Sequence, residues 1–439
     1  MAVPAKDKFT KQEKSWILYD WANSVYATNI MAAIFPIYFT AVCGGDTAGI
    51  QWWGYGTSLA TLIVAVLAPI LGSLGDYKGM KKKFFTFFMA VGVLCTLIMA
   101  IFDNWQMLLV GYILSYIGFA GSCLFYDSFL TDVTTRERMD KVSAWGYAMG
   151  YIGGSTIPFL ISIGILLVMG MDNPTAVKIV VVLTSVWWGL FSIPMLRNVD
   201  QKYYLEGRPE RMVSAAFSNV AHTLRDIVKN KGLFCYVIAY FCYIDGVGTV
   251  IHMSTSYGST LGLDTVGMIL ALLVTQIVAM PCSVLFGRLA KKLGAVRMIG
   301  IAIAIYFLIC VVGFYMGYII EVDESAVGTA QVLFWMMAFL VGTVQGGIQA
   351  LSRSYFSRLV PPDKSNEYFG FFDIFGKFAT VVGPFLVAAV TGLTGRSSFG
   401  ILSLLVLFAV GGLILFLGRS QLKASEEAAE AARKAAERS

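Results

Sequence analysis

Long apolar stretches separated by short polar segments make up nearly the whole chain. Each stretch holds about 20 residues or more, which is enough for an α-helix to cross a hydrocarbon layer about 30 Å thick. Twelve stretches meet this criterion, at residues 16–42, 50–75, 84–102, 105–131, 142–170, 175–197, 232–258, 264–290, 297–320, 327–356, 366–392 and 397–419. The pattern therefore predicts an all-α integral membrane protein with twelve transmembrane helices.

Composition argues against several other classes of protein. Hydrophobic residues make up 57% of the chain and charged residues 14%, whereas soluble domains carry about 25% charged residues. The seven cysteines are scattered and the two histidines lie far apart in the sequence, so no metal-ligand spacing is present. We expect no cofactor and no metal. We also expect no enzyme, because no nucleophile–base constellation is found.

Positive charges divide unequally between the two sides of the predicted bundle. Of the 33 Lys and Arg residues, all but Lys178, Lys377 and Arg396 fall in segments on the same side as the N-terminus. The positive-inside rule then predicts that both termini are cytoplasmic. We expect a multi-pass protein of a bacterial inner membrane without a cleavable signal peptide. The net charge of +6 follows from this topology, so no nucleic-acid partner is expected.

The longest polar connection divides the predicted helices six and six. It covers residues 198–230, and its second part has apolar residues at helical spacing, which is typical of an amphipathic helix at the membrane surface. The chain is predicted to contain an N-terminal six-helix bundle at 1–197, this linker, a C-terminal six-helix bundle at 231–420 and a polar helical tail at 421–439. We assign the tail no chemistry.

The two predicted bundles resemble each other in sequence. A shift of 215 residues places Gly72, Leu74 and Gly79 on Gly287, Leu289 and Gly294, and a shift of 226 places Gly150, Pro158 and Phe159 on Gly376, Pro384 and Phe385. The second shift also places the segment Asp127-Ser128-Phe129 on Arg353-Ser354-Tyr355, and Asp132 on Arg358. These matches predict a duplicated unit and two pseudo-symmetric six-helix bundles.

The segment GSLGDYKGMKKK, from Gly72 to Lys83, resembles the signature that major facilitator proteins carry between their second and third helices. Its glycines permit close packing and a tight turn, and its acid can cap the N-terminus of a neighbouring helix. We predict a gating role for Gly72, Asp76 and Gly79. An ordinary basic loop is the alternative, and the equivalent segment of the second half has Lys291 in place of the acid.

Polar side chains inside the predicted helices are candidates for a substrate site, because burying a charge at bilayer depth costs roughly 2.5–3.5 kcal/mol. In the first helix Asp20 and Asn23 share a face, with Tyr26 beside it. A carboxylate, an amide and a phenol can bind an ammonium group and other polar atoms. Asp20 lies less than two turns from the predicted cytoplasmic end, so an acid that lines a gate or reaches the interface is the alternative.

The second half carries a further set of polar side chains. Asp245 lies in the seventh predicted helix, Gln345 and Gln349 in the tenth, and Asp373 and Lys377 in the eleventh. Arg353 follows Gln345 and Gln349 at intervals of four, and two amides with a guanidinium suit a carboxylate or phosphate group. A polar seam between helices and a mutually neutralising Asp373–Lys377 pair are the alternatives. We expect Asp245, Gln345 and Lys377 to line one central cavity between the two bundles.

Asp127 and Arg353 are predicted at pseudo-equivalent positions near the cytoplasmic ends of the fourth and tenth helices. We expect this pair of opposite charges to favour closure of that side, as members of a polar network between the two bundles. Asp76 is expected to add to the network by capping the eleventh helix.

Three further segments carry a family resemblance. They are LYDWANSVYATNI from Leu18, GGIQALSRSYFSRLVP from Gly346 and YFGFFDIFGKFATVVGP from Tyr368. These segments are similar to the signatures of the unknown-major-facilitator family, which is related to the autophagy-associated vacuolar amino-acid effluxers of fungi. The resemblance implies the twelve-helix major facilitator fold, a secondary transporter, and amino acids as the class of substrate.

A secondary transporter that works by alternating access is therefore our leading hypothesis, with a small polar or zwitterionic solute such as an amino acid or small peptide. An amphipathic ligand, either a lysolipid or a quaternary amine bound by tyrosines, is the alternative solute. A membrane receptor that does not transport is a more distant alternative, because no sizeable soluble domain is predicted.

The sequence is compatible with more than one energy source. No GxxxxGK[ST] motif is present, so ATP does not drive the chain directly. Proton coupling through Asp20, Asp245 or Asp373 and facilitated diffusion both fit the sequence. We expect a monomer in the lipid bilayer.

Overall fold

A computed structural model describes residues 8–43, 46–170, 173–207 and 212–436. Within the helices, the description leaves out the side chains at 46–50, 212–218, 265–266, 269, 377–380 and 432–436. The side chain of Lys377 is among those left out, so its predicted place in a cavity lies outside the described residues.

The described chain is helical almost throughout. The first half forms α1 (Lys11–Tyr26), η2 (Ala27–Ala33), α2 (Phe35–Val42), α3 (Asp46–Gly75), α4 (Met80–Met99), α5 (Trp105–Ser128), α6 (Leu130–Val133), η3 (Arg136–Arg138), α7 (Met139–Met149), η4 (Gly150–Thr156), α8 (Ile157–Met169) and α9 (Pro174–Asn198). The second half forms α10 (Met212–Lys229), α11 (Lys231–Thr260), α12 (Thr265–Leu293), α13 (Ala295–Val322), η5 (Glu324–Ala326), α14 (Val327–Leu359), η6 (Pro362–Lys364), α15 (Ser365–Thr394), α16 (Ser397–Leu417) and α17 (Arg419–Ala436).

Among the described residues, eleven helices are long and apolar enough to cross a membrane. A twelfth span results if Lys11–Ala33 and Phe35–Val42 are counted together across a bend of 41°. The twelve predicted stretches coincide with these helices to within a few residues at each end. The prediction of an all-α, multi-pass membrane protein is confirmed.

Two of the predicted spans contain a short π-helical segment. η2 separates α1 from α2, and η4 separates α7 from α8. Pro36 or Pro158 stands at the start of the helix that follows. Proline has no N–H for the helical ladder and its ring clashes with the preceding turn. The chain bends by 41° between Lys11–Ala33 and Phe35–Val42, within the predicted span 16–42, whereas Arg136–Met169 forms one span that contains the predicted stretch 142–170.

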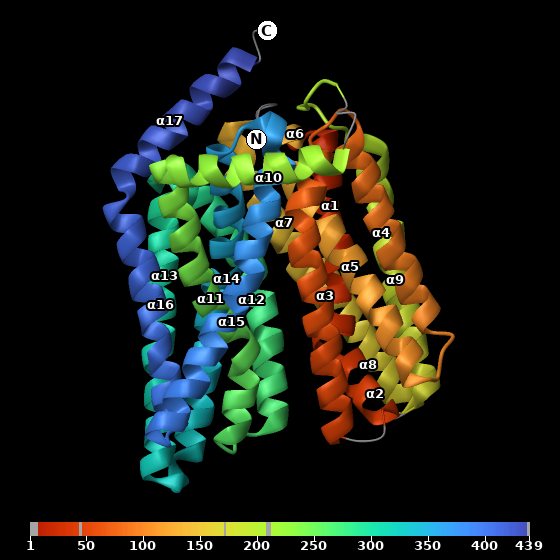
Figure 1. The fold of residues 1–439 in the computed structure, drawn as a ribbon. Coiled ribbons are helices and arrows are strands. Elements are labelled where there is room, and N and C mark those ends of the chain that lie inside the picture. Colours follow the sequence, from red (N-terminus) through yellow and green to blue (C-terminus); the bar gives the residue numbers. More distant parts are fainter. Residues whose placement is uncertain (1–7, 44–45, 171–172, 208–211, 437–439) are drawn as a thin grey trace, which may run out of the picture. The chain divides into compact units, whose positions relative to one another are not determined.

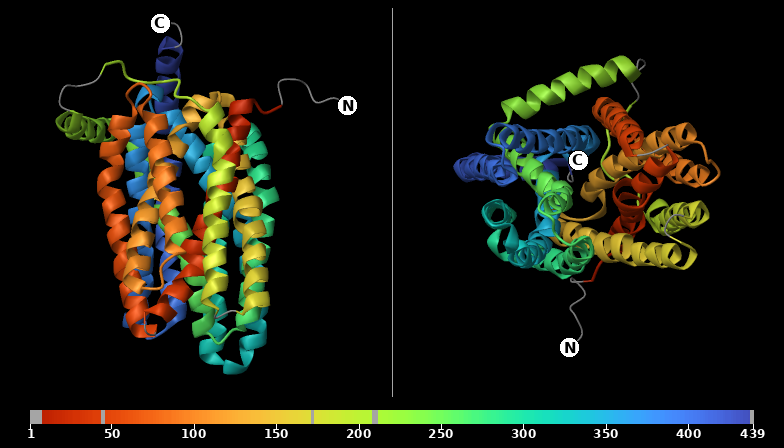
Figure 2. Two further views of the ribbon diagram at one scale, coloured as in Figure 1. Left: turned by 90° about the vertical axis from the view of Figure 1, so that its right-hand side faces the viewer. Right: turned by 90° about the horizontal axis from the view of Figure 1, so that it is seen from below.

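The chain divides into two compact units. Unit 1 contains Met1–Arg138, Met149–Ala221 and Pro362–Phe371, and unit 2 contains Met139–Ala148, His222–Pro361 and Phe372–Ser439. Each unit thus includes a short segment from the other half of the sequence, since the start of α7 belongs to unit 2 and the start of α15 to unit 1. Within each unit the long helices run side by side (Figures 1 and 2).

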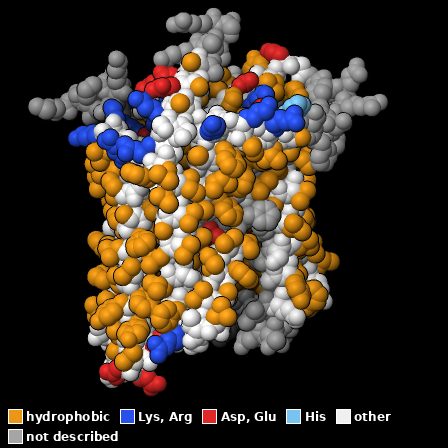
Figure 3. Space-filling model, turned by 60° about the vertical axis from the view of Figure 1, so that its left-hand side comes forward, with side chains coloured by type: hydrophobic (Ala, Val, Ile, Leu, Met, Phe, Trp, Pro, Cys, Tyr) orange, Lys and Arg blue, Asp and Glu red, His pale blue; other side chains and the backbone are white. Residues whose placement is uncertain are grey.

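Aromatic side chains fill the interior of unit 1, and aliphatic side chains cover the outer flanks of the helices. Trp16 stacks on Tyr126 with ring centroids 4.4 Å apart, and both rings are buried. By contrast, the Val168 side chain is 88% exposed. Hydrophobic side chains cover most of the face drawn in Figure 3, and most of its Lys and Arg side chains gather at one end. This distribution is typical of helices surrounded by lipid.

Candidate functional site

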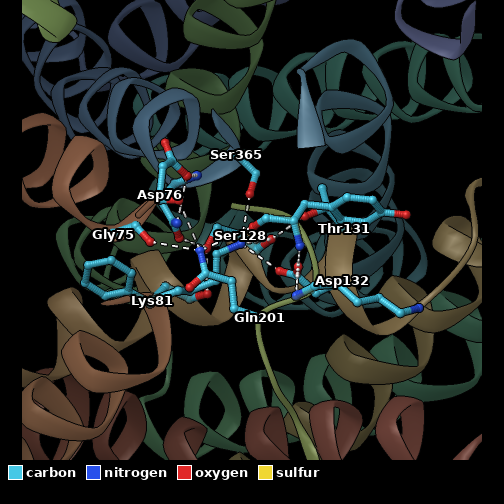
Figure 4. Close-up of polar contacts among 12 residues, drawn as sticks. Gly75, Asp76, Lys81, Ser128, Thr131, Asp132, Gln201 and Ser365 are labelled. Carbon is cyan, nitrogen blue, oxygen red and sulfur yellow. Dashed lines mark hydrogen bonds and ion pairs between the residues drawn. The ribbon is translucent and has the colours of Figure 1, made fainter. Parts of the chain in front are cut away.

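Asp76, in the loop between α3 and α4, accepts hydrogen bonds from the N-terminus of α15. Its Oδ1 accepts the backbone N–H and the side-chain amide of Asn366 at 2.9 and 2.8 Å, and its Oδ2 accepts the Glu367 N–H at 3.1 Å (Figure 4). The first N–H groups of a helix have no partner within the helix, and the helix dipole favours a negative charge beside them. Asp76 therefore caps α15, as the signature predicted.

The Asp76 carboxyl is withdrawn from solvent, with 1% of its surface exposed. Burial raises the pKa of this carboxyl well above its usual range, while the Lys81 ammonium and the N–H groups of Asn366 and Glu367 lower it in part. A carboxylate is a stronger acceptor than a carboxylic acid, so the cap is strongest when Asp76 is ionised. The Lys81 ammonium and these N–H groups favour the ionised form, and the cap therefore depends on them.

The glycines of the signature serve the approach of α3 to α15 and a turn. A Cβ on Gly72 would overlap the Asn366 carbonyl and would lie 3.1 Å from the Glu367 Cα. Gly79 has a φ of 72°, in the left-handed region that favours glycine, and it immediately precedes α4. Close contact and backbone conformation thus explain the two positions physically. Their predicted role in gating stays a prediction.

A buried ion pair lies beside the cap. Lys81 Nζ is 2.7 Å from Asp132 Oδ2, and neither side chain is exposed (Figure 4). The same Nζ donates to Ser365 Oγ, at the start of α15, at 2.9 Å. Asp132 Oδ1 accepts the backbone N–H groups of Lys202 and Tyr203 at 2.8 and 3.0 Å. These extra hydrogen bonds are what two charges need to offset their lost hydration.

The segment that follows α9 is attached to the signature loop. The Leu205 N–H donates to the Asp76 carbonyl at 2.9 Å, and the Lys78 N–H donates to the Leu205 carbonyl at 3.4 Å. Gln201 Nε2 donates to the carbonyls of Gly75 and Asp76 at 3.2 and 3.3 Å (Figure 4). The beginning of the predicted linker is thus part of the packing around Asp76.

Unit 2 contains equivalent contacts at the sequence offsets given above. Ser128 Oγ donates to Asn366 Oδ1 in unit 1, and 226 residues away from each partner Ser354 Oγ donates to Asp140 Oδ1 in unit 2. The glycine that matches Gly72 is Gly287, on which a Cβ would lie 3.1 Å from the Asp140 carbonyl. Two offsets found separately in the sequence therefore meet at one contact, which supports the duplicated unit.

Arg353, the sequence equivalent of Asp127, is buried in unit 2. Its Nε donates to Ser143 Oγ at 3.0 Å and its Nη2 to the Ser143 carbonyl at 3.2 Å. The guanidinium carbon lies 4.5 Å from the centre of the Tyr147 ring. Asp127 is half-buried and belongs to unit 1. A direct interaction between Asp127 and Arg353 stays a prediction.

The polar side chains of α1 are paired with α5 inside unit 1. Tyr126 Oη donates to Asp20 Oδ2 at 2.7 Å, Tyr26 Oη lies 2.7 Å from Ser115 Oγ, and Asn23 Nδ2 lies 3.9 Å from Cys123 Sγ. Tyr26 is fully buried, and Asp20 and Asn23 are buried as well. These contacts connect the helices of unit 1. A role of Asp20, Asn23 and Tyr26 in substrate binding stays a prediction.

Asp245 is a fully buried carboxyl in α11. Its two oxygens lie 3.0 and 2.9 Å from the backbone nitrogen of Gly383 in α15, and Oδ1 lies 3.5 Å from Thr249 Oγ1. Pro384 follows Gly383 and lacks an N–H, which weakens the α15 hydrogen-bond ladder at this point. Among the side chains that the structure describes, no Lys or Arg forms an ion pair with Asp245.

Gln345 is buried in α14 with 3% of its surface exposed, and its Nε2 has no hydrogen-bond partner among the described residues. Gln349, one turn later, donates to the Gln345 carbonyl at 3.1 Å. Asp373 in α15 is half-buried. Gln345 thus holds an unused amide donor inside a membrane-spanning helix. No group of three His, Cys, Asp or Glu side chains in the described part of the chain is arranged to hold a metal ion.

The sequence profile of the family described as "Vacuole effluxer Atg22 like" matches residues 53–429. The chain belongs to this family. The "Uncharacterized MFS-type transporter YxiO" of Bacillus subtilis is 45% identical over 93% of this chain and 95% of that protein. The "Autophagy-related protein 22" of Eremothecium gossypii is 23% identical over 68% of this chain, and the match spans 60% of the fungal protein.

The fold of this Atg22-like protein is the major facilitator fold. Its structure is similar to that of the proton:xylose symporter XylE bound to 6-bromo-6-deoxy-D-glucose, with a TM-score of 0.68. The likeness covers 92% of this chain and 94% of the symporter at 12% sequence identity. At this identity the comparison establishes the fold and nothing about the solute.

Three partners at these contacts of the Atg22-like chain are residues to which the sequence pattern assigns no role. Asn366 and Gly383 are uncharged and gave no signal of their own. Ser128 had a signal, because the offset of 226 residues places it on Ser354, and the same offset joins their partners Asn366 and Asp140. A sequence repeat can therefore indicate a contact when both residues of that contact recur at the same offset.

Proposed function

We propose that this Atg22-like protein is a secondary transporter that moves a small polar or zwitterionic solute, an amino acid or small peptide, by alternating access. The family description names effluxers, and the Bacillus subtilis relative is named as an MFS-type transporter. The observation that carries the proposal is that unit 2 buries a carboxyl and an unused amide donor within its membrane-spanning helices.

Asp245 is the acceptor in this proposal. An ionised carboxylate at bilayer depth costs roughly 2.5–3.5 kcal/mol, and its partners in the described structure are an N–H and a hydroxyl, both uncharged. An ammonium group of the solute or a proton would neutralise it. We therefore propose that Asp245 binds one of these two cations during transport.

Gln345 is the donor. A buried donor left without a partner costs about 1–3 kcal/mol, and a solute carboxylate would satisfy the Gln345 amide. We propose that Gln349, Asp373 and Lys377 complete the polar set in the second half, with Asp20, Asn23 and Tyr26 in the first. An apolar solute would leave these groups unpaired. The amphipathic alternative has less support, because Tyr236 and Tyr243 are buried and bonded to Ser352.

The proposed gate consists of the signature residues Gly72, Asp76 and Gly79 together with Asp127 and Arg353. We propose that both termini are cytoplasmic, in a bacterial inner membrane, and that the contacts of Asp76 with α15 break when the cytoplasmic side opens. Proton coupling and facilitated diffusion remain alternatives for the energy source.

The test is flux of labelled amino acids and dipeptides in proteoliposomes, with and without a proton gradient. Asp245→Asn and Gln345→Ala should each lower the flux at least tenfold, since each removes one group that binds the solute. Glu324→Gln is the matched control, because Glu324 is an exposed acid outside the proposed site. Wild-type protein with no flux of any amino acid or dipeptide in either direction would remove this class of solute. Full flux in both site variants would remove the proposed site.

A further inference from the structure

The C-terminal helix α17 is attached to unit 2 along one of its sides. Leu422 is buried, and the half-buried positions Ser425, Glu426 and Ala429 follow at helical spacing. Ser425 Oγ donates to Asn230 Oδ1, just before α11, at 2.6 Å. The sequence of this tail by itself indicates no chemistry. Its contacts instead bring one of its acids to a half-buried arginine of α14.

Two carboxylates lie close to this arginine, Arg358. Its Nη2 donates to Asp140 Oδ1 at 3.0 Å. Its Nε is buried without a hydrogen-bond partner among the described residues, and Glu426 Oε1 lies 3.9 Å from it. The Arg358 side chain is 13% exposed and that of Glu426 is 28% exposed. One carboxylate is therefore hydrogen-bonded to the guanidinium, and the other stands within ion-pair distance beside an unused donor.

The two carboxylates belong to different parts of the chain. Asp140 lies in α7, in the first half of the sequence, whereas Glu426 follows α16 and lies in the same half as Arg358. In alternating access, which this inference takes from the proposed function, the two halves move against each other. The Arg358–Asp140 hydrogen bond must then break, while Glu426 stays beside Arg358.

We propose that the Arg358 guanidinium forms its hydrogen bond with Glu426 when Asp140 moves away. In this way α17 lowers the free energy needed to open the side predicted to be cytoplasmic. A half-buried guanidinium left without a countercharge is unfavourable, because its lost hydration is not offset. Glu426 prevents this without a large rearrangement, since rotation of two side chains closes the remaining gap. Glu426 acts as a positioning residue for Arg358 and has no contact with the solute in this proposal.

Hydrogen–deuterium exchange of the segment 139–148 in the full-length purified protein tests the proposal, because amide exchange follows the population of the open form. Asp140→Asn should speed exchange, since it weakens the closed contact. Glu426→Gln should slow it by about two- to fivefold, the range expected for a partly exposed ion pair. Glu427→Gln is the matched control, because Glu427 is exposed and pairs with Lys423 on the same helix.

A double-mutant cycle with Arg358→Gln shows whether the effect passes through the arginine. Glu426→Gln should change nothing in that background. The proposal is overturned if Glu426→Gln leaves exchange unchanged or speeds it in the wild-type background, or if the effect persists without Arg358. Flux assays separate this proposal from the proposed function: altered exchange with no flux of any solute would reject only transport, and normal flux with unaltered exchange would reject only the role of Glu426.

Discussion

The buried charges of Lys81 and Asp132 are matched by each other across a long separation in sequence. Lys81 and Asp132 are 51 positions apart and form a pair with no exposed surface. The pair also holds Ser365 and the backbone after α9, so four segments of unit 1 meet at two side chains. At the residue scale, the pair is therefore expected to matter for stability more than any surface ion pair.

Replacing Lys81 by Met should destabilise the protein by about 3–5 kcal/mol, because the buried Asp132 carboxylate loses its countercharge. The double variant Lys81→Met, Asp132→Asn should recover much of this loss. Thermal unfolding of the purified proteins in one detergent measures both. Lys82→Met is the control, since the pair of Lys82 with Asp200 is largely exposed and such pairs contribute about 0–1 kcal/mol. A Lys82 variant as unstable as the Lys81 variant would contradict the assignment.

Helices in unit 1 approach each other through caps and glycines. Asp76 fixes the first turn of α15, and η4 packs against α1 where a Cβ on Gly153 would overlap the Trp21 ring. Both contacts involve backbone as well as side chains. Substitutions at these caps and glycines should therefore act locally, and their effect should be detectable in one helix at a time.

Asp76→Asn should loosen the first turn of α15, since an amide carries no charge to offset the helix dipole and presents one acceptor oxygen in place of two. Loss of an N-terminal cap costs about 0.5–2 kcal/mol, which corresponds to about two- to thirtyfold faster amide exchange at 365–371. Asp200→Asn serves as control in the same region. Equal exchange in all three proteins would show that the cap does not hold this turn.

Gly153→Ala should destabilise unit 1 by about 1–3 kcal/mol, because the added methyl group forces the Trp21 ring away from η4. Gly164→Ala, on the same predicted span, should be neutral or stabilising, since no atom lies within 4 Å of the added Cβ and alanine favours helix. The melting temperatures of the two variants, compared with that of the wild-type protein, test this prediction. The contact is misassigned if the two substitutions shift the melting temperature equally.

At the scale of the whole molecule, the two halves of the sequence exchange short segments. The start of α7 belongs to unit 2 and the start of α15 to unit 1. If the halves move against each other during transport, these segments must separate from their present partners. The opposite charges of Asp127 and Arg353, at equivalent positions of the two halves, are then expected to affect the equilibrium between closed and open forms.

Asp127→Asn, at a half-buried carboxyl, should shift the protein toward an inward-open form by no more than about 1–2 kcal/mol, and Arg353→Gln, which also loses the hydrogen bonds of a buried guanidinium, should shift it by at least as much. A shift of about 1–2 kcal/mol is about a five- to thirtyfold change in a balanced equilibrium. Labelling of single cysteines at cavity positions, applied from the cytoplasmic side, measures the shift. The charge swap Asp127→Arg, Arg353→Asp should restore function better than either change alone if the two side chains touch. Unchanged labelling in both single variants would assign these charges to topology or folding.

The twelve spans, the duplicated unit and the cap by Asp76 could all be predicted from the sequence alone. The spans can be predicted because each segment of about 20 residues must satisfy its own backbone hydrogen bonds in lipid. The duplicated unit can be predicted because its glycines recur at the same positions in both halves. The partners of Lys81, Asp245 and Glu426 were decided only by the tertiary structure. Pairing of this kind depends on which helix faces meet, and no local pattern encodes it, because the partners lie far apart in sequence. Asp132 lies 51 residues from Lys81, Ser365 lies 284 residues from Lys81, and Gly383 lies 138 residues from Asp245.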